Sequence, residues 1–241
     1  SASVTDGSRI PEFVDRAYKI ALSGYPGPVH LSVPVDIMFS SFEEDSQRDE
    51  RPFVRKAESP PKAWPEPQRL HSILEEFEKS KKPMLIGGHG VWWGNAEKKL
   101  EEVGKTLKIP VYNIPYHQKL LPETSDAYMG LADIHQYPPS AKALEESDLV
   151  MMLGGRLDNQ MNFGNPPLFP KNSRLICING SPEELEQNRS ADQILLSDPS
   201  AFLEALMDFG KSRTSKERDE WYSLQKILRQ EWVESSLLDL E

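Results

Sequence analysis

The stretch PMLIGGHG, from Pro83 to Gly90, decides the fold that this sequence predicts. Met84, Leu85 and Ile86 form a short apolar run, which is typical of a strand buried on both faces of a sheet. Glycines follow at positions 87, 88 and 90, and they suit a tight turn in which the backbone passes close to another group. An open α/β nucleotide-binding domain begins in this way. The dinucleotide fingerprint G-x-G-x-x-G would need glycine where Trp93 stands, so the motif alone is weak.

Apolar residues recur at helical and strand spacing downstream of position 67. We expect helices around 70–77, 96–107, 141–146, 182–187 and 202–207, and strands at 83–90, 109–114, 149–153, 174–178 and 193–196. We expect 115–138 to be irregular and 156–172 to form a long loop. Strands that alternate with helices imply parallel pairing. The predicted fold class is therefore α/β, a Rossmann-like parallel sheet with helices on both faces. Ligands of such sheets bind beyond the carboxyl ends of the strands, here 87–90, 115–118, 154–158 and 179–181.

The first 40 residues show a different pattern. Residues 1–8 read as a loop, a helix begins near Pro11 and ends at Gly24, and the alternation in VHLSVPVDI predicts a strand over 29–37. One helix and one strand cannot bury a core, so we expect this segment to be the tail of a domain whose larger part lies elsewhere. Residues 43–68 are acidic and then rich in proline, which predicts an extended linker.

Composition narrows the function classes. The net charge is −10 and the pI is about 5.1, which argues against nucleic-acid binding as the main role. No apolar run approaches the ~20 residues that span a bilayer, and no signal peptide opens the sequence. The single cysteine, Cys177, excludes an internal disulfide framework and fits the reducing cytoplasm. It lies in the middle of an expected strand, where a buried, inert thiol is the simplest interpretation.

A last helix follows the polar segment after Gly210. Its apolar positions are Trp221, Leu224, Ile227, Leu228 and Trp232. The sequence leaves two roles open for this stripe: it packs on the surface of the α/β domain, or it leads into a further domain.

Three landmarks in a fixed order carry a family resemblance. They are GYPGPVHLSVPVDI at 24–37, KKPMLIGGHGV at 81–91, and SDLVMMLGGRLDNQMNFGNPP at 147–167, which continues to LICINGSPEEL at 175–185. Together they resemble the thiamine-diphosphate-dependent enzymes of the acetolactate synthase, oxalyl-CoA decarboxylase and 2-hydroxyacyl-CoA lyase group. The run at 162–167 looks closer to the acyl-CoA lyase branch.

The resemblance implies a division of the chain into parts. Residues 1–42 would be the tail of a pyrimidine-binding domain, 43–66 a linker, 67–210 a central Rossmann-like domain of the deoxyhypusine synthase-like topology, and 211–241 a helical lead-in to a diphosphate-binding domain. The family's activating glutamate would lie upstream. Its Gly-Asp-Gly motif, which is absent from this sequence, would lie downstream. Thiamine diphosphate and Mg²⁺ would then bind outside this chain, which alone would be inactive.

The resemblance also implies a cytoplasmic homodimer or homotetramer with a small-molecule substrate, bound to neither nucleic acid nor membrane. The intact enzyme would be a lyase or carboligase acting on 2-oxo acids or 2-hydroxyacyl-CoA. The alternative is a free-standing NAD- or FAD-type nucleotide-binding module without thiamine chemistry. The segment 24–37 argues against that alternative, because a free-standing module has no use for an orphan strand.

FAD-containing relatives hold their nucleotide along the edge of the central sheet, and the resemblance carries those contacts onto this sequence. Backbone N–H groups at glycines approach a pyrophosphate, an arginine pairs with it, and a carboxylate takes ribose hydroxyls. Asn179 and Ser181 stand where acetolactate synthases usually show aspartates, so FAD, an ADP- or CoA-type nucleotide, and no nucleotide all stay open. The candidate cofactor contacts are Gly87, Gly88, His89, Gly90, Gly154, Arg156, Asp158, Asn179 and Ser181.

We assign no catalytic and no metal-binding residue to this chain. His117 and His135 have no cysteine or carboxylate at ligand spacing. His89 is either a ligand contact or a polar loop residue, and the sequence does not separate the two. Trp92 and Trp93 either stack on a ring or, more simply, pack a loop.

Overall fold

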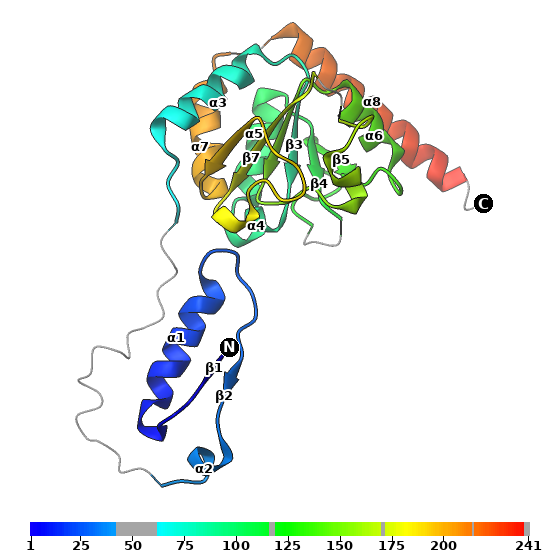
Figure 1. Ribbon diagram of the computed structural model, residues 1–241. Helices are drawn as coiled ribbons and strands as arrows, with labels where there is room; N and C mark the ends of the chain where they lie inside the picture. Colours follow the sequence, from blue (N-terminus) through cyan, green and yellow to red (C-terminus); the bar gives the residue numbers. More distant parts are fainter. Residues whose placement is uncertain (42–61, 116–118, 170–171, 214, 239–241) are drawn as a thin grey trace. The chain divides into compact units, whose positions relative to one another are not determined.

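The computed structural model describes residues 1–41, 62–115, 119–169, 172–213 and 215–238. The chain divides into two compact units, Ser1–Pro61 and Lys62–Glu241. Figure 1 traces the first unit in blue and the second from cyan to red. The expected linker at 43–66 lies mostly outside the described residues, as does His117.

The second unit is built on one six-stranded sheet (Figure 1). All its neighbouring strands are parallel, and their order is β5-β4-β3-β6-β7-β8. The first strand of this sheet in the chain, β3, lies between β4 and β6, which is the Rossmann arrangement. The direction in which strands are added reverses between β3 and β6. The strands are β3 (Pro83–Gly87), β4 (Val111–Asn113), β5 (Tyr128–Leu131), β6 (Leu149–Leu153), β7 (Arg174–Asn179) and β8 (Gln193–Leu196).

Helices cover both faces of this sheet, as the sequence predicts. On one face lie α3 (Pro67–Lys79), α4 (His89–Trp93), α5 (Glu97–Leu107) and α7 (Pro199–Gly210), and their apolar residues form one buried cluster with the sheet. On the other face α6 (Pro138–Glu146) and α8 (Lys216–Leu238) enclose a second cluster (Figure 1). Side chains alternate across a strand, so β3 gives Leu85 to the first cluster and Met84 and Ile86 to the second.

Local sequence signals explain where these helices begin and end. Both α3 and α7 begin at a proline, whose missing N–H costs least in the first turn. The carboxylate of Asp198 accepts a hydrogen bond from Ser200 N at 2.9 Å and so caps α7. Lys108 adopts a left-handed conformation with φ of 56° and ends α5.

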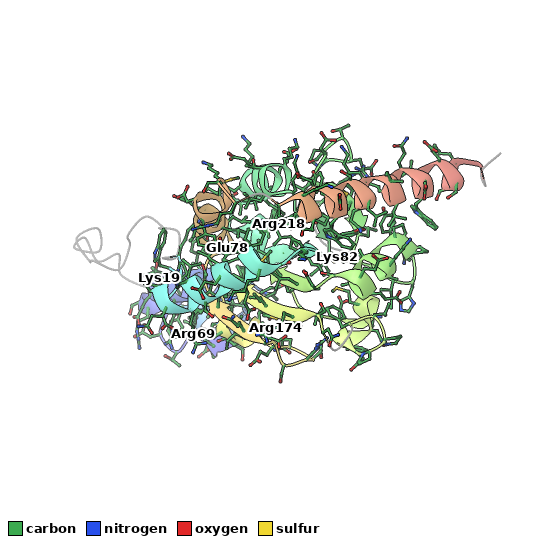
Figure 2. All side chains as sticks on the ribbon, turned by 90° about the horizontal axis from the view of Figure 1, so that it is seen from above. Lys19, Arg69, Glu78, Lys82, Arg174 and Arg218 are labelled. Atoms are coloured by element: carbon green, nitrogen blue, oxygen red, sulfur yellow. The ribbon has the colours of Figure 1, made fainter. Side chains whose placement is uncertain are left out.

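The long helix α8 packs on the sheet, which confirms the first of the two roles left open for it. Trp221 Nε1 donates to the carbonyl of Pro83 at 2.9 Å, and Tyr112 Oη donates to Gln225 Oε1 at 3.0 Å. Near the start of α8 the Arg218 guanidinium stacks 4.6 Å from the centre of the Phe77 ring, and Figure 2 shows Arg218 close to α3. Burial lowers the pKa of Arg218, and the neighbouring Glu78 carboxylate opposes that shift.

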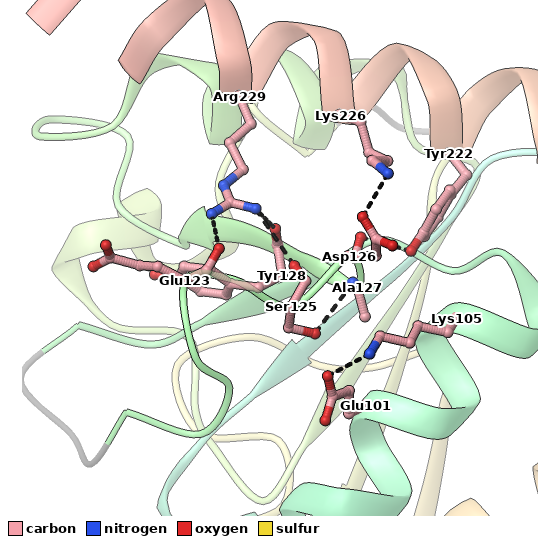
Figure 3. A network of polar contacts seen from close by, with 10 residues as sticks. All are labelled: Glu101, Lys105, Glu123, Ser125, Asp126, Ala127, Tyr128, Tyr222, Lys226 and Arg229. Atoms are coloured by element: carbon pink, nitrogen blue, oxygen red, sulfur yellow. Dashed lines mark hydrogen bonds and ion pairs between the residues drawn. The ribbon is translucent and has the colours of Figure 1, made fainter. Parts of the chain in front are cut away.

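A polar network fixes the middle of α8 to the segment before β5 (Figure 3). Arg229 donates to the carbonyls of Tyr128 at 2.8 Å and of Glu123. Lys226 Nζ contacts Asp126 Oδ1 at 2.6 Å, and Tyr222 Oη donates to the carbonyl of Asp126, also at 2.6 Å. The helix is therefore held by backbone and side-chain contacts as well as by apolar packing.

The first unit departs from the sequence prediction in two places. It contains η1 (Gly7–Arg9), α1 (Ile10–Leu22) and α2 (Val35–Met38), and two parallel strands, β1 (Ala2–Ser3) and β2 (Leu31–Ser32). The expectation of a loop over 1–8 is wrong, because β1 pairs with a strand far along the chain. The expectation of a strand over 29–37 is confirmed only at Leu31–Ser32 and is wrong on either side of them. Pro34 instead precedes the first turn of α2, a position that needs no N–H donor.

The expectation of an irregular segment over 115–138 is also wrong in its middle, where β5 forms the edge of the sheet. Gly130 lies in that strand with φ of 121°, and a Cβ there would stand 2.4 Å from the Tyr137 ring. The other strands lie within two residues of their predicted bounds, except β3, which ends at Gly87, three residues before its predicted end. Among the described residues, no helix combines the length and apolar character needed to span a membrane.

Candidate functional site

The carboxyl edge of the sheet at the β3–β6 reversal is the place where α/β folds bind ligands. The register aligns Gly87 of β3 with Asn113 of β4 and Leu153 of β6, so these strands end level with one another. The glycines after β3 and β6 meet there. The sequence-predicted site residues thus fall along one edge, in two groups described in turn.

The first group is a contact between two glycine turns. A Cβ on Gly88 would stand 2.5 Å from Gly155 Cα, and a Cβ on Gly90 would stand 2.7 Å from Gly154 Cα. Real Cβ atoms do not approach so closely, so this packing requires glycine on both segments. Gly154 also has φ of 63°, which favours glycine.

Three glycine amides of these turns, at Gly88, Gly90 and Gly154, are already used within the chain. Gly88 N donates to the carbonyl of Leu153 at 2.9 Å, and Gly90 N donates to the carbonyl of Gly154 at 2.8 Å. The glycines therefore join β3 to β6 by backbone hydrogen bonds. A pyrophosphate at this edge would need donors other than the N–H groups of Gly88 and Gly90.

Gly87 faces the interior, where a Cβ would stand 2.6 Å from Leu120 Cδ1. His89 and Gly90 lie in the first turn of α4. The expectation that all of 87–90 forms a turn is therefore wrong at its second half, because a short helix begins directly after Gly88.

Three aromatic rings gather on α4. His89 stacks on Trp93 with ring centres 5.7 Å apart and planes at 10°, and Trp92 meets Trp93 edge-on at 4.8 Å. Trp92 is 37% exposed and Trp93 40% exposed. The three rings pack on one another within one short helix, and part of each indole remains exposed to solvent. Stacking of the tryptophans on a ligand ring stays a prediction.

The second group lies beyond β6 and β7. Arg156 holds Glu184 in a two-point ion pair, Nε to Oε2 at 2.8 Å and Nη2 to Oε1 at 2.7 Å. The Arg156 side chain is 46% exposed and that of Glu184 is 9% exposed. Asp158 caps the short helix η3 (Asn159–Gly164), where its carboxylate accepts a hydrogen bond from Gln160 N at 3.2 Å.

Asn179 ends β7 and Ser181 lies in the turn that follows; they are 4% and 1% exposed. Ser181 N donates to Asn179 Oδ1 at 3.2 Å, and the Ser181 hydroxyl donates to the Glu183 carboxylate. That hydrogen bond lowers the pKa of Glu183. The turn is thus closed by its own side chains.

Sequence reasoning missed two residues of this edge. Gly155 is the partner of Gly88, and the doubled glycine after β6 mirrors the doubled glycine after β3. Glu184 is the partner of Arg156, and its distance of 28 residues in sequence hides the pair. Over the described ranges no group of three or more His, Cys, Asp or Glu residues is placed to hold a metal ion. The described residues therefore do not fit a site for Mg²⁺ and a diphosphate.

Comparison with known proteins agrees with this architecture. The family model described as "Thiamine pyrophosphate enzyme, central domain" matches residues 70–206. A probable acetolactate synthase large subunit of Methanococcus aeolicus is 25% identical over 233 residues, which are 94% of this chain and 37% of that protein. A 2-hydroxyacyl-CoA lyase of Arabidopsis thaliana is 28% identical over 192 residues, 77% of this chain and 32% of that protein.

Solved structures show the same fold. The thiamine diphosphate-dependent 4-hydroxybenzoylformate decarboxylase of Rhodococcus jostii RHA1 superposes with a TM-score of 0.72 at 20% identity, over 90% of this chain and 40% of that one. The fold and the carboxyl-edge turns define a Rossmann-like α/β domain. The chain belongs to the thiamine pyrophosphate enzyme family, as its central domain, and it spans about a third of the length of the relatives it matches.

Proposed function

We propose that this chain is the middle part of a larger thiamine-diphosphate-dependent enzyme that acts on 2-oxo acids or on 2-hydroxyacyl-CoA. The observation that carries the proposal is the family match over 70–206, which coincides with the six-stranded sheet. The proposed parts are a pyrimidine-domain tail at 1–42, a linker at 43–66, the central domain at 67–210 and a lead-in at 211–241. The enzyme is proposed to be cytoplasmic.

The first unit supports this arrangement. Its helix α1 buries none of its side chains, and Val35, Met38 and Phe39 are 68%, 61% and 82% exposed. Such an apolar surface is costly in water and fits a unit that further residues of a pyrimidine-binding domain would cover. Thiamine diphosphate, when bound, supplies the carbanion chemistry. The described residues contribute the sheet that spaces the catalytic domains and the surfaces on which those domains rest.

The coding sequence on either side tests this proposal. We expect a glutamate codon upstream, in a pyrimidine-binding domain, and a Gly-Asp-Gly motif with a following asparagine downstream. A reading frame that closes immediately on both sides would contradict the proposal and favour the free-standing nucleotide-binding module.

We also propose that the carboxyl edge holds an FAD or ADP-type nucleotide, with Arg156 as the main phosphate contact. The Arg156 side chain is 46% exposed, which supports this choice, because the Gly88 and Gly90 amides are used within the chain. The other candidate residues then contribute to the shape of the carboxyl edge of the sheet. They are Gly87, His89, Gly154, Asp158, Asn179 and Ser181. Trp92 and Trp93 lie on α4, directly after β3, and their exposed indole surfaces could stack on the base of such a nucleotide.

Thermal unfolding with FAD, ADP, CoA or NAD tests the nucleotide site. We expect at least one nucleotide to raise the midpoint in the wild type and Arg156→Ala to abolish that rise. Arg174→Ala is the matched control, because Arg174 also pairs with a glutamate, Glu76 at 2.7 Å, but at the amino end of its strand (Figure 2). A midpoint unmoved by all four nucleotides, or moved equally in both variants, would contradict the site.

A further inference from the structure

The loop after β6 contains a left-handed turn, a backbone conformation that residues other than glycine rarely adopt. Asn162 has φ of 50° and ψ of 36°, Phe163 has φ of 54° and ψ of 22°, and Gly164 continues with φ of 74°. Glycine suits this region, and asparagine tolerates it because its short polar side chain can form local hydrogen bonds. Phenylalanine has no such compensation, so Phe163 is the strained member of the turn.

The surrounding contacts hold this turn in place. The carbonyl of Asp158 accepts hydrogen bonds from Met161 N at 3.1 Å and from Phe163 N at 2.8 Å. Arg189 Nη1 donates to the carbonyl of Gly164 at 2.6 Å, and a Cβ on Gly164 would stand 2.8 Å from Arg189 Cδ. A strained conformation persists only where its surroundings over-determine it, and these contacts do so.

The strained residue adds little to the core in return. Phe163 is 44% exposed, whereas Met161, two residues earlier, is 0% exposed. Asparagine or glycine at position 163 would adopt the same backbone at a lower conformational cost. Strain of this kind gathers at active sites and ligand clamps. Packing among the described residues therefore does not explain why a phenylalanine stands at this position.

The turn lies close to the cation that we propose as the main phosphate contact. Asp158, whose carbonyl accepts the Phe163 N–H, is two residues from Arg156, a separation of at most about 7 Å between Cα atoms. Glu184 fixes the Arg156 guanidinium at 2.7 Å, and the Arg156 side chain is still 46% exposed. A cation and an exposed aromatic ring on one fixed loop match a ligand that carries a phosphate and a planar ring.

We propose that Phe163 stacks on the base of a nucleotide whose phosphate binds Arg156, and that this contact is the reason for the strained turn. The proposal rests on the nucleotide site proposed above, and it names the residue on which the base lies. Stacking on an aromatic ring accepts any base, so Phe163 selects nucleotides over pyrophosphate and not one base over another.

Two substitutions that both remove the ring test the strain. Phe163→Ala keeps the strained backbone under a side chain with a Cβ, whereas Phe163→Gly relieves it. In thermal unfolding of the 241-residue chain, we expect the glycine variant to unfold about 2–4 °C above the alanine variant. At a residue with ordinary negative φ the order would be the reverse, because glycine costs more conformational entropy on folding than alanine.

Isothermal titration calorimetry of the same chain with ADP and with inorganic pyrophosphate tests the stacking. We expect Phe163→Ala to weaken ADP binding about tenfold and pyrophosphate binding less than about twofold, because only ADP carries a base. Phe163→Tyr keeps an aromatic ring and should bind ADP as the wild type does. Arg156→Ala should weaken the binding of both compounds, because Arg156 acts on the phosphate.

These measurements separate failure of the stacking contact from failure of the nucleotide site. If Arg156→Ala weakens ADP binding and Phe163→Ala does not, the site stands and the stacking contact is overturned. If Trp93→Ala weakens ADP binding and Phe163→Ala does not, the base lies on α4 and the stacking contact is again overturned. A wild-type chain that binds neither compound would contradict the site and the stacking contact together. An alanine variant at least as stable as the glycine variant would overturn the strain at position 163.

Discussion

Gly88 and Gly155 lie so close that a Cβ on Gly88 would stand 2.5 Å from Gly155 Cα. This contact joins the turn after β3 to the turn after β6, at the point where the strand order reverses. A glycine-rich turn in an α/β sheet is commonly read as a cradle for a ligand. In this chain the same glycines first serve the approach of two backbone segments to each other.

Substitution of Gly88 by alanine should destabilise the central domain. The added methyl group meets backbone atoms on the neighbouring turn, which cannot move aside as a flexible side chain would. We expect a loss of about 2–4 kcal/mol in the free energy of unfolding, measured by urea denaturation.

Gly180→Ala is the matched control at the same edge of the sheet. The nearest atom to a Cβ there is the Ser197 carbonyl oxygen at 3.9 Å, an ordinary contact. We expect a change below about 0.5 kcal/mol, as for substitutions at uncrowded sites. Equal losses for both variants would show that the contact between the two turns is not what requires glycine at position 88.

Arg229 ties α8 to the segment before β5, and its removal should loosen that helix. Alanine at this position leaves the carbonyls of Tyr128 and Glu123 without their donor. We expect a loss of about 1–3 kcal/mol in unfolding free energy and faster amide hydrogen exchange in α8. Lys216→Ala on the same helix, where the lysine side chain is 87% exposed and pairs with Glu220, should change stability by less than about 0.5 kcal/mol. Unchanged exchange in the Arg229 variant would contradict an anchoring role.

Cys177 should make stability fall as the pH rises above 9. Burial raises the pKa of this thiol from 9.0 to about 11. Between those values the unfolded chain loses the proton and the folded chain keeps it, so rising pH favours unfolding. The stability is fully present below pH 9, and we expect about 1 kcal/mol to be lost between pH 8 and pH 10.

The comparison with Cys177→Ala isolates this contribution, since the tyrosines titrate alike in both proteins. The difference in unfolding free energy between wild type and variant should shrink by about 1 kcal/mol over that pH range. A thiol reagent at pH 8 should react with Cys177 only after denaturant is added. A constant difference across the pH range, or rapid labelling of the native protein, would rule out a buried neutral thiol.

Much of the central domain could be predicted from sequence because its signals are local. The run from Leu149 to Leu153 is continuously apolar, and β6 occupies those residues. The spacing of Leu70, Ile73, Leu74 and Phe77 predicts a helix, and α3 forms there with these side chains packed in or against the first buried cluster. Burial on both faces of a parallel sheet leaves a strong pattern in a short window.

The errors fall where contacts are distant in sequence. The strand β5 contains Gly130, a residue unfavourable in strands, and the reason for it is the Tyr137 ring packed against its Cα. The strand β1 exists through its pairing with Leu31–Ser32, about thirty residues away. The partner of Arg156 could not be foreseen either, because Glu184 is brought to it by the turn after β7. The positions of the candidate site residues along one edge followed from topology, whereas their bonding partners did not.

The most direct test of the central claim is an activity measurement on the product of the whole reading frame that contains this chain. Carbon dioxide release from a 2-oxo acid, or cleavage of a 2-hydroxyacyl-CoA, is measured with and without thiamine diphosphate and Mg²⁺. We predict turnover that requires both additions, and no turnover by the 241-residue chain under the same conditions. Turnover by the 241-residue chain alone, or a whole product that neither binds nor needs thiamine diphosphate, would contradict the account.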